Sequence, residues 1–227
     1  MKVIAHRGAS KAERENTLGA FRRAYELGAD WVELDARRTA DGALIVHHDP
    51  RLSDGRNLVD LVKDQLPDHV PSLFSALAAC APMGINIEIK NDPSEVDFDP
   101  LAAMAGWVVD LIAELDLSER VLISTFHLPT LDRVRVLNPE LATAWLVMKA
   151  GNNGLETLLD HGHRVIHPSN TGLTEEQILS CHAAGVEVNV WTVDEPGRMR
   201  ELMDWGVDGI CTNVPDVMRS VIRGRGA

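Results

Sequence analysis

The sequence has no long apolar run, since no segment approaches the roughly 18 consecutive apolar residues of a membrane-spanning helix. Cysteine is scarce: the three present, Cys80, Cys181 and Cys211, show no metal-ligand spacing and are typical of reduced thiols in a cytosolic chain. Positive charge is also scarce, because 22 Lys and Arg stand against 34 Asp and Glu, for a net charge of −12. This balance argues against nucleic acid or an anionic membrane surface as a partner.

Linkers and nucleotide-binding signatures are absent as well. No Pro- or Ser-rich stretch, low-complexity segment or glycine-rich nucleotide fingerprint interrupts the 227 residues. Single α/β barrels commonly have about 200 to 250 residues. We therefore expect one domain spanning residues 1–227. The N-terminal MKVIAHRG enters a strand at once and leaves no room for a signal peptide, so we expect a cytoplasmic protein.

Apolar runs alternate with helical periodicity along the chain. Helical patterns cover residues 16–29, 100–116, 174–185 and 195–206, with Asn16 or Thr17 available to cap the first. We expect eight strands, at residues 3–7, 31–35, 86–90, 120–126, 141–148, 163–169, 186–193 and 209–213. This alternation favours a closed parallel barrel over an open doubly wound sheet.

An additional apolar run, residues 43–49, follows the tight-turn signal Asp41-Gly42. A hairpin centred on residues 40–42 would return the chain antiparallel beside the second strand and bring His48 level with Glu33 and Asp35. Residues 58–66 would then form a short amphipathic helix over one end of the barrel. The fold class expected is α/β, a (β/α)8 TIM barrel with a short insertion after the second strand.

Carboxylates occupy strand positions with apolar neighbours. Glu33 and Asp35, at positions i and i+2, share one face of a strand, and Glu88 lies on a neighbouring strand. Ionised groups in apolar surroundings are costly unless they are paired or bind a metal. Oxygen-only ligation favours a hard cation such as Mg²⁺, Ca²⁺ or Mn²⁺. The alternative is that these carboxylates form ion pairs with Arg7, Arg37 or Lys90 and support the fold.

Histidines stand beside these strands. His6 and His48 are candidates for a general acid and base, since imidazole titrates near neutral pH. His47 is adjacent to His48 and should face the other way on a strand, which makes it the weaker candidate. His167 ends a strand and could line the barrel mouth.

Two cations and an aromatic residue complete the candidate site. Arg7 can bind a phosphate through its planar fork of donors, and Lys90 adds a point charge on the strand face of Glu88. Trp191 shares a strand face with Asn189, and an aromatic ring at a barrel mouth commonly packs against the carbon skeleton of a ligand. The structural alternatives are that Arg7 or Lys90 neutralises a carboxylate and that Trp191 packs in the core.

Taken together, these motifs resemble the glycerophosphodiester phosphodiesterase family, in the short, soluble, bacterial-type cytoplasmic form. The resemblance covers nearly the whole chain. It rests on His6-Arg7, Glu15-Asn16-Thr17, Glu33-Leu34-Asp35, His48-Asp49, and residues 87–90, 124–126, 190–196 and 206–215.

The resemblance implies a (β/α)8 barrel that hydrolyses glycerophosphodiesters to sn-glycerol 3-phosphate and an alcohol with one divalent cation, Mg²⁺ or Ca²⁺. It also implies a role for each candidate residue. Glu33, Asp35 and Glu88 match the metal ligands, His6 and His48 the acid–base pair, Arg7 and Lys90 the phosphate contacts, and Trp191 the glycerol pocket. Which histidine is the acid, whether the nucleophile is water or the glycerol 2-hydroxyl, and the oligomeric state stay open.

The same resemblance leaves alternatives. Related barrels act on lipid diesters as lysophospholipase D-like or cyclising enzymes, although the net charge and the lack of an apolar anchor argue against stable membrane association. A non-catalytic barrel that binds phosphodiesters would usually lack a ligand or a histidine, and none is missing here. An unrelated metal-dependent barrel enzyme would leave the paired histidines unexplained.

Two residues depart from the pattern of the family. Arg14 replaces a proline, and Asn213 replaces a frequent aspartate. Residues 52–56 replace an Arg-Thr-Thr run. These changes affect the loops around the alcohol end of the substrate. The short segment between His48 and Pro71 indicates an open mouth, suited to water-soluble diesters with varied headgroups.

Overall fold

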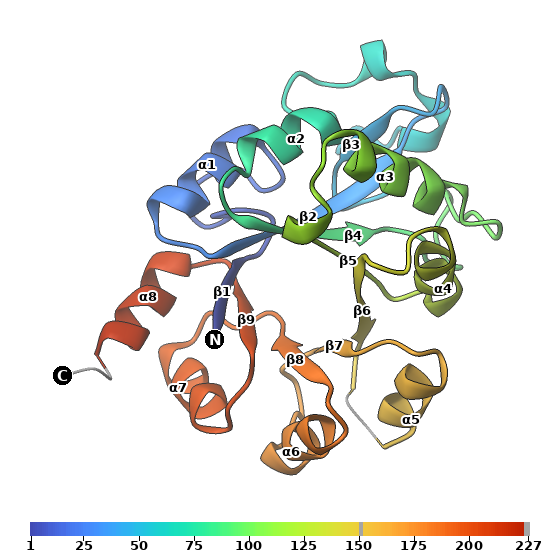
Figure 1. The fold of residues 1–227 in the computed structure, drawn as a ribbon. Helices are drawn as coiled ribbons and strands as arrows, with labels where there is room; N and C mark the ends of the chain where they lie inside the picture. The colour runs from blue at the N-terminus through green and yellow to red at the C-terminus, as the bar shows by residue number, and fades with distance from the viewer. Residues whose placement is uncertain (150–151, 225–227) are drawn as a thin grey trace.

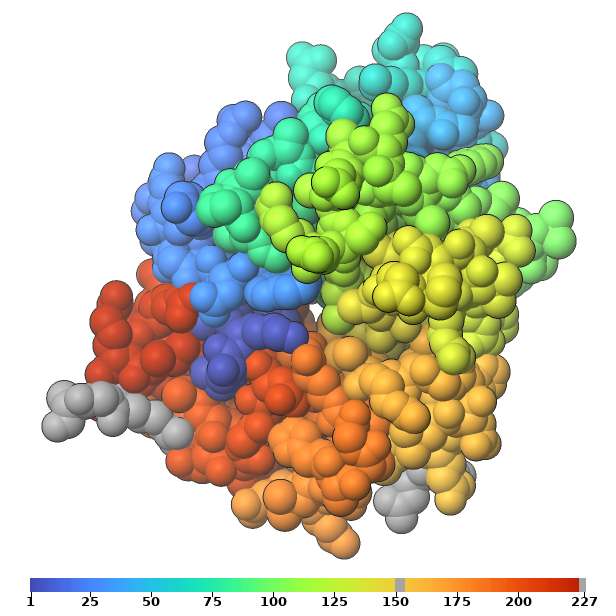
Figure 2. Space-filling model, in the orientation of Figure 1, coloured from blue at the N-terminus to red at the C-terminus, as the bar shows by residue number. Residues whose placement is uncertain are grey.

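The computed structural model describes residues 1–149 and 152–224. Parallel strands form a closed ring because β1 pairs with both β2 and β9 (Figure 1). The N-terminal and C-terminal segments accordingly lie side by side on the surface in Figure 2. The eight strands are β1 (Lys2–Ala5), β2 (Trp31–Arg38), β4 (Gly84–Ile89), β5 (Val121–Thr125), β6 (Ala142–Val147), β7 (Val165–Pro168), β8 (Glu187–Val190) and β9 (Gly209–Thr212).

A helix follows each of these strands and packs outside the ring (Figure 1), which confirms the predicted (β/α)8 barrel. Thr17 caps the first helix by accepting a hydrogen bond from the Ala20 N–H, and Ser72 and Thr174 cap two others in the same way. The helices are α1 (Leu18–Glu26), α2 (Leu73–Ala79), α3 (Ala103–Glu114), α4 (Leu128–Leu137), α5 (Asn152–Asp160), α6 (Glu175–Ala183), α7 (Pro196–Asp204) and α8 (Pro215–Arg223).

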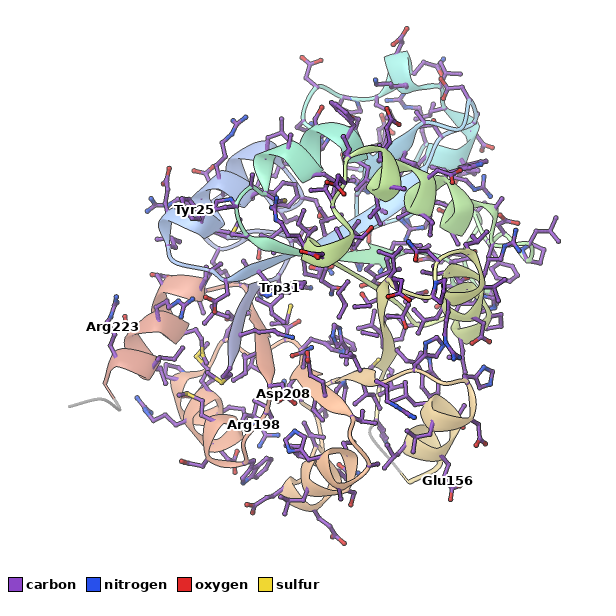
Figure 3. The ribbon with its side chains drawn as sticks, in the orientation of Figure 1. Tyr25, Trp31, Glu156, Arg198, Asp208 and Arg223 are labelled. Atoms are coloured by element: carbon purple, nitrogen blue, oxygen red, sulfur yellow. The ribbon has the colours of Figure 1, made fainter. Side chains whose placement is uncertain are left out.

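Aliphatic side chains fill the layer between strands and helices. Ile87 and Ile123 pack with Val108 and Ile112 of α3, and all four are fully buried. The three cysteines are buried and free, as expected. In Figure 3, Trp31 and Asp208 lie near the ring of strands, whereas Glu156 and Arg223 lie on the outer helices. No helix within residues 1–149 and 152–224 is long and apolar enough to cross a membrane.

The register between β2 and β4 aligns the predicted site residues. Asp35 lies directly beside Glu88, and Glu33 lies beside Asn86. Neighbouring parallel strands keep paired residues on the same face, so the three carboxylates point to one side. Register and side-chain alternation together therefore bring these acids to the carboxyl ends of the strands.

The insertion is a hairpin, as the turn signal predicts. Strand β3 (Leu44–Val46) runs antiparallel to β2, with Ala36 paired to Val46. The pairing continues one step further, because the His47 N–H donates to the Asp35 carbonyl at 2.9 Å. This contact confirms that the hairpin returns His48 to the level of the carboxylates.

The prediction of a helix over residues 58–66 is wrong. Two 3-10 turns, η1 (Leu58–Asp60) and η2 (Lys63–Gln65), occupy the segment instead. Leu61 and Val62 between them are extended, because the Leu61 carbonyl accepts from the Ala40 N–H and Asp41 accepts from the Lys63 N–H. Apolar side chains of the segment pack against the hairpin in a small separate cluster of Ile45, Leu52, Leu58, Leu61 and Val70.

Candidate active site

The predicted site residues come together at the carboxyl ends of the strands. They line a cavity of about 70 Å³, the inner cavity, which is also bordered by Phe126, His167 and Asn189. Trp191 follows the end of β8 and forms a single bridge to Ser169, so the predicted strand over residues 186–193 ends earlier than expected. The predicted residues that line the cavity are His6, Arg7, Glu33, His48, Glu88, Lys90 and Trp191.

Asp35 does not line the inner cavity, but it lies close to the other two acids. One oxygen of each of Glu33, Asp35 and Glu88, here called the carboxylate cluster, lies within 4.8 Å of the others. Glu33 and Asp35 are 5% and 1% exposed. Glu33 Oε1 and Asp35 Oδ1 are buried and have no hydrogen-bond partner among the described residues. Buried carboxylate oxygens without partners are a strong sign of a ligand, and oxygen donors suit a hard divalent cation.

Burial and, after it, mutual repulsion govern the protonation of the cluster. Burial raises the pKa of Glu33 well above its usual value, and the charges of Asp35 and Glu88 raise it further. Burial also raises the pKa of Glu88. The pKa of Asp35 is about 2, because the cations Lys90 and Arg7 outweigh the effect of burial. Glu33 and Glu88 therefore hold their protons to higher pH than isolated side chains do, whereas Asp35 is readily ionised.

Lys90 and Arg7 partly neutralise the cluster. Lys90 Nζ lies 2.8 Å from Glu88 Oε1 and 3.5 Å from Asp35 Oδ1, and Arg7 Nε lies 3.3 Å from Asp35 Oδ2. The ion-pair alternative is thus realised for Asp35 and Glu88. Within residues 1–149 and 152–224, Glu33 forms no ion pair with a side-chain cation, so the donor set still fits a metal ion.

The loop after β1 wraps the cluster with unusual backbone geometry. Arg7 and Asn16 both have φ of +56°, a left-handed conformation that non-glycine residues rarely adopt. This conformation accompanies donation from the Arg7 N–H to Glu33 Oε2 at 2.8 Å and from Asn16 Nδ2 to Asp35 Oδ2 at 2.7 Å. Sequence reasoning considered Asn16 only as a helix cap or part of a motif and missed this contact.

His6 is held from outside the inner cavity. Its Nδ1 lies 2.7 Å from Asn213 Oδ1, beyond the end of β9. Burial lowers the pKa of His6, and the neighbouring Arg7 lowers it further. His6 is therefore neutral near pH 7 in the free protein, which suits a proton acceptor.

His48 is held by its backbone and by Asp49. Its Nδ1 lies 2.7 Å from Asp49 Oδ1, and its carbonyl accepts from Arg37 Nε at 2.7 Å. Arg37 is fully buried and pairs with Asp97 at 2.6 Å and Glu95 at 2.8 Å, rather than with the carboxylate cluster. Burial lowers the pKa of His48, with Asp35 opposing and Lys90 reinforcing this shift.

Two aromatic side chains, Trp191 and Phe126, border the inner cavity. Trp191 Nε1 donates to the His167 carbonyl at 2.7 Å, and the Trp191 and Phe126 rings meet edge to face at 5.6 Å between centroids. His167, which the sequence left open, lines this cavity, and burial lowers its pKa to about 3. Its Nε2 faces Asn189 Nδ2 at 3.1 Å.

A second, larger hollow adjoins the first. This outer cleft has a volume of about 650 Å³ and is lined by residues 47–54 of the insertion, residues 94–96, and Arg14, Glu15, Pro67 and His69. His48 lines both hollows and marks their junction. A substrate with its reacting atom at His48 could extend a small part inward and a larger part into the open cleft.

Comparison with known proteins gives consistent matches. The model of a family described as the glycerophosphoryl diester phosphodiesterase family matches residues 6–217. A glycerophosphodiester phosphodiesterase of Caldanaerobacter subterraneus is 32% identical, with 97% of each chain covered. A probable glycerophosphodiester phosphodiesterase 2 of Mycobacterium tuberculosis is also 32% identical, covering 99% of this chain and 91% of that relative.

Solved structures agree in fold. A crystal structure described as a glycerophosphoryl diester phosphodiesterase of Silicibacter pomeroyi superposes with a TM-score of 0.90 at 25% identity, covering 100% of this chain and 94% of the other. An Oleispira antarctica phosphodiesterase, solved in complex with the product sn-glycerol-3-phosphate, has a TM-score of 0.86 at 24% identity over 98% and 97% of the two chains. At that identity, the second match supports the fold alone.

Proposed function

The chain belongs to the glycerophosphoryl diester phosphodiesterase family, and from this membership we propose that it hydrolyses glycerophosphodiesters to sn-glycerol 3-phosphate and an alcohol. One observation carries the proposal most directly. A carboxylate cluster with buried oxygens that lack hydrogen-bond partners in the described part of the chain lies at the same cavity as two histidines and two cations. This combination suits metal-assisted acid–base chemistry on an anionic diester.

In this proposal, Glu33, Asp35 and Glu88 hold one divalent cation, Mg²⁺ or Ca²⁺. When bound, such a cation would neutralise charge on the phosphoryl oxygens. Arg7 and Lys90 bind the phosphate, which requires them to exchange part of their present contacts with the carboxylates for contacts with the substrate.

The histidines exchange protons with the substrate. One accepts the proton of the nucleophile, which is water or the glycerol 2-hydroxyl, and the other donates a proton to the leaving alkoxide. Nδ1 of each ring is occupied, at Asn213 for His6 and at Asp49 for His48. Nε2 is therefore the reacting atom that we assign on both.

The two hollows suggest how the substrate lies. The small inner cavity, bordered by Trp191 and Phe126, suits the glycerol end, and the outer cleft suits the alcohol. Because that cleft is wide and lined by charged groups, we propose water-soluble diesters with varied headgroups as substrates. A strict preference for one headgroup among choline, ethanolamine, inositol and glycerol would contradict this part.

The test is release of sn-glycerol 3-phosphate from glycerophosphocholine by the purified protein with Mg²⁺, with Ca²⁺ and with excess chelator. We expect metal-dependent release, abolished by the chelator and restored by adding the cation back. Full activity in chelator would contradict the metal assignment. Faster turnover of lysophosphatidylcholine than of glycerophosphocholine would favour the lipid-diester alternative, and no product from a wider diester panel would favour a binding barrel.

A further inference from the structure

A chain of hydrogen bonds connects His6 to residues that do not line the inner cavity. Asn213 Oδ1 lies 2.7 Å from His6 Nδ1 and accepts from Ser10 Oγ at 2.8 Å. Asn213 Nδ2 donates to Asp194 Oδ2 at 2.7 Å. Two segments far apart in sequence, the loops after β1 and β9, thus meet beside a candidate catalytic histidine.

Asp194 is itself fixed by donors. Its Oδ1 accepts from the Asn213 backbone N–H at 2.8 Å and from Thr212 Oγ1 at 3.0 Å. An ionised carboxylate accepts hydrogen bonds and cannot donate them. The amide nitrogen of Asn213 must therefore face Asp194, which leaves its oxygen facing His6. The orientation of this amide follows from chemistry, since only one of the two flips satisfies both neighbours.

The orientation of the amide decides the tautomer of His6. A neutral imidazole carries one proton, and an amide oxygen 2.7 Å from Nδ1 requires that proton to be on Nδ1. Nε2 then presents its lone pair. The opposite flip of Asn213 would present an N–H to Nδ1 and move the proton to Nε2.

We propose that Asn213, locked by Asp194, is a positioning residue that holds His6 as the Nδ1–H tautomer, so that Nε2 accepts the proton of the nucleophile. The kinetic part of this inference rests on the proposed function, whereas the tautomer can be measured without substrate. The carboxylate of this network lies one residue further from His6, at Asp194.

The decisive variants change the carboxylate at residue 194 and the amide at residue 213. In Asp194→Asn, residue 194 gains donors and no longer fixes the Asn213 amide, so a mixture with the Nε2–H tautomer of His6 is expected. In the double variant Asp194→Asn with Asn213→Asp, residue 213 can only accept from His6, and the new amide at 194 can still bond Thr212 and residue 213. The exchange keeps the net charge and should restore the Nδ1–H tautomer.

The primary measurement is the ¹⁵N chemical shift of the His6 ring nitrogens at about pH 8, where imidazole is neutral, assigned with a His6→Gln sample. We expect an unprotonated Nε2 in the wild-type protein and the double variant, and protonation of Nε2 in Asp194→Asn. In parallel, kcat should fall by about 10²-fold in Asp194→Asn with little change in KM, and recover at least tenfold in the double variant.

Asp132→Asn is the matched control, because Asp132 also contacts histidines, His161 and His163, but lies outside the site. Its His6 spectrum and kcat should equal those of the wild type. An unprotonated Nε2 in Asp194→Asn, or no recovery of tautomer and kcat in a folded double variant, would overturn the proposal. Correct tautomers without glycerophosphodiester turnover in the wild type would instead contradict the proposed function and leave the positioning role intact.

Discussion

The Lys90 ammonium lies 2.8 Å from Glu88 Oε1, inside the group of carboxylates that we assign to a metal ion. Lys90 is therefore a counter-ion of the cluster in the free protein and a phosphate contact in the proposed complex. As a counter-ion, Lys90 lowers the affinity of the cluster for a metal ion, because its positive charge repels a second cation.

Replacing Lys90 with methionine should accordingly separate metal binding from substrate binding. We expect Lys90→Met to bind Ca²⁺ about tenfold more tightly, since a like charge near the ion is removed. KM for the diester should rise because one phosphate contact is lost. Calorimetric titration with Ca²⁺ and steady-state kinetics measure the two effects, and weaker Ca²⁺ binding would contradict the assignment of the cluster.

Glu33→Gln should stabilise the metal-free protein while removing its response to metal. Burial and two neighbouring carboxylates disfavour the ionised Glu33, so a neutral isostere relieves repulsion. We expect a higher Tm in chelator, a smaller rise in Tm on adding Ca²⁺, and activity lowered at least about 10²-fold. Glu114→Gln, at the exposed end of α3, is the control and should leave all three quantities unchanged.

The same repulsion makes the effect of Glu33→Gln on Tm depend on pH. Because the folded-state pKa of Glu33 is raised above its usual value of 4.5, its contribution to stability is largest below that value and is lost as pH rises. The Tm advantage of Glu33→Gln in chelator should therefore widen between about pH 5 and about pH 8. Thermal melts of both proteins across this range test the sign, and a narrowing difference would be inconsistent with the raised pKa.

In the wild-type protein, the rise in Tm on adding Ca²⁺ should also increase with pH. Metal and protons compete for Glu33 and Glu88, whose pKa values are both raised, so metal binding releases protons. At a fixed Ca²⁺ concentration, the rise in Tm should be larger at about pH 8 than at about pH 5. Asp35, with a pKa of about 2, stays ionised throughout and should not contribute to the trend.

Arg37 should be required for stability and for the position of His48. Arg37→Leu leaves the Asp97 carboxylate buried without its cation and frees the His48 carbonyl. We expect the free energy of unfolding to fall by about 3 kcal/mol in urea titrations. Arg56→Leu, which removes an exposed pair with Asp54, is the matched control and should change stability little.

His48→Gln should lower kcat by about 10²- to 10⁴-fold, because glutamine cannot transfer the proton. The rise in Tm on adding Ca²⁺ should persist, since the carboxylate cluster is intact. His47→Gln is the neighbouring control. Its side chain lines the outer cleft and not the inner cavity, so we expect an effect on KM rather than kcat. Equal losses of kcat in both variants would contradict the assignment of His48.

Much of the fold was predictable because its signals are local. Alternating apolar residues and helical periodicity indicated the eight parallel strands, and Asp41-Gly42 indicated the hairpin that places His48. Residues 58–66 were misread because an apolar pattern over so short a segment fits a helix and two 3-10 turns equally well. The contacts that decided between them, to Ala40 and Asp41, come from another part of the chain.

The sequence by itself determined which chemical groups are present and which face of its strand each occupies, because side-chain direction alternates within a strand. Tertiary structure decided their partners. Asn213 reaches His6 across 207 positions of sequence, and Asp97 reaches Arg37 across 60, only because barrel closure and the pairing of β2 with β4 bring those segments together. No local periodicity encodes such contacts, since they depend on strand register and on loops packed around a closed ring.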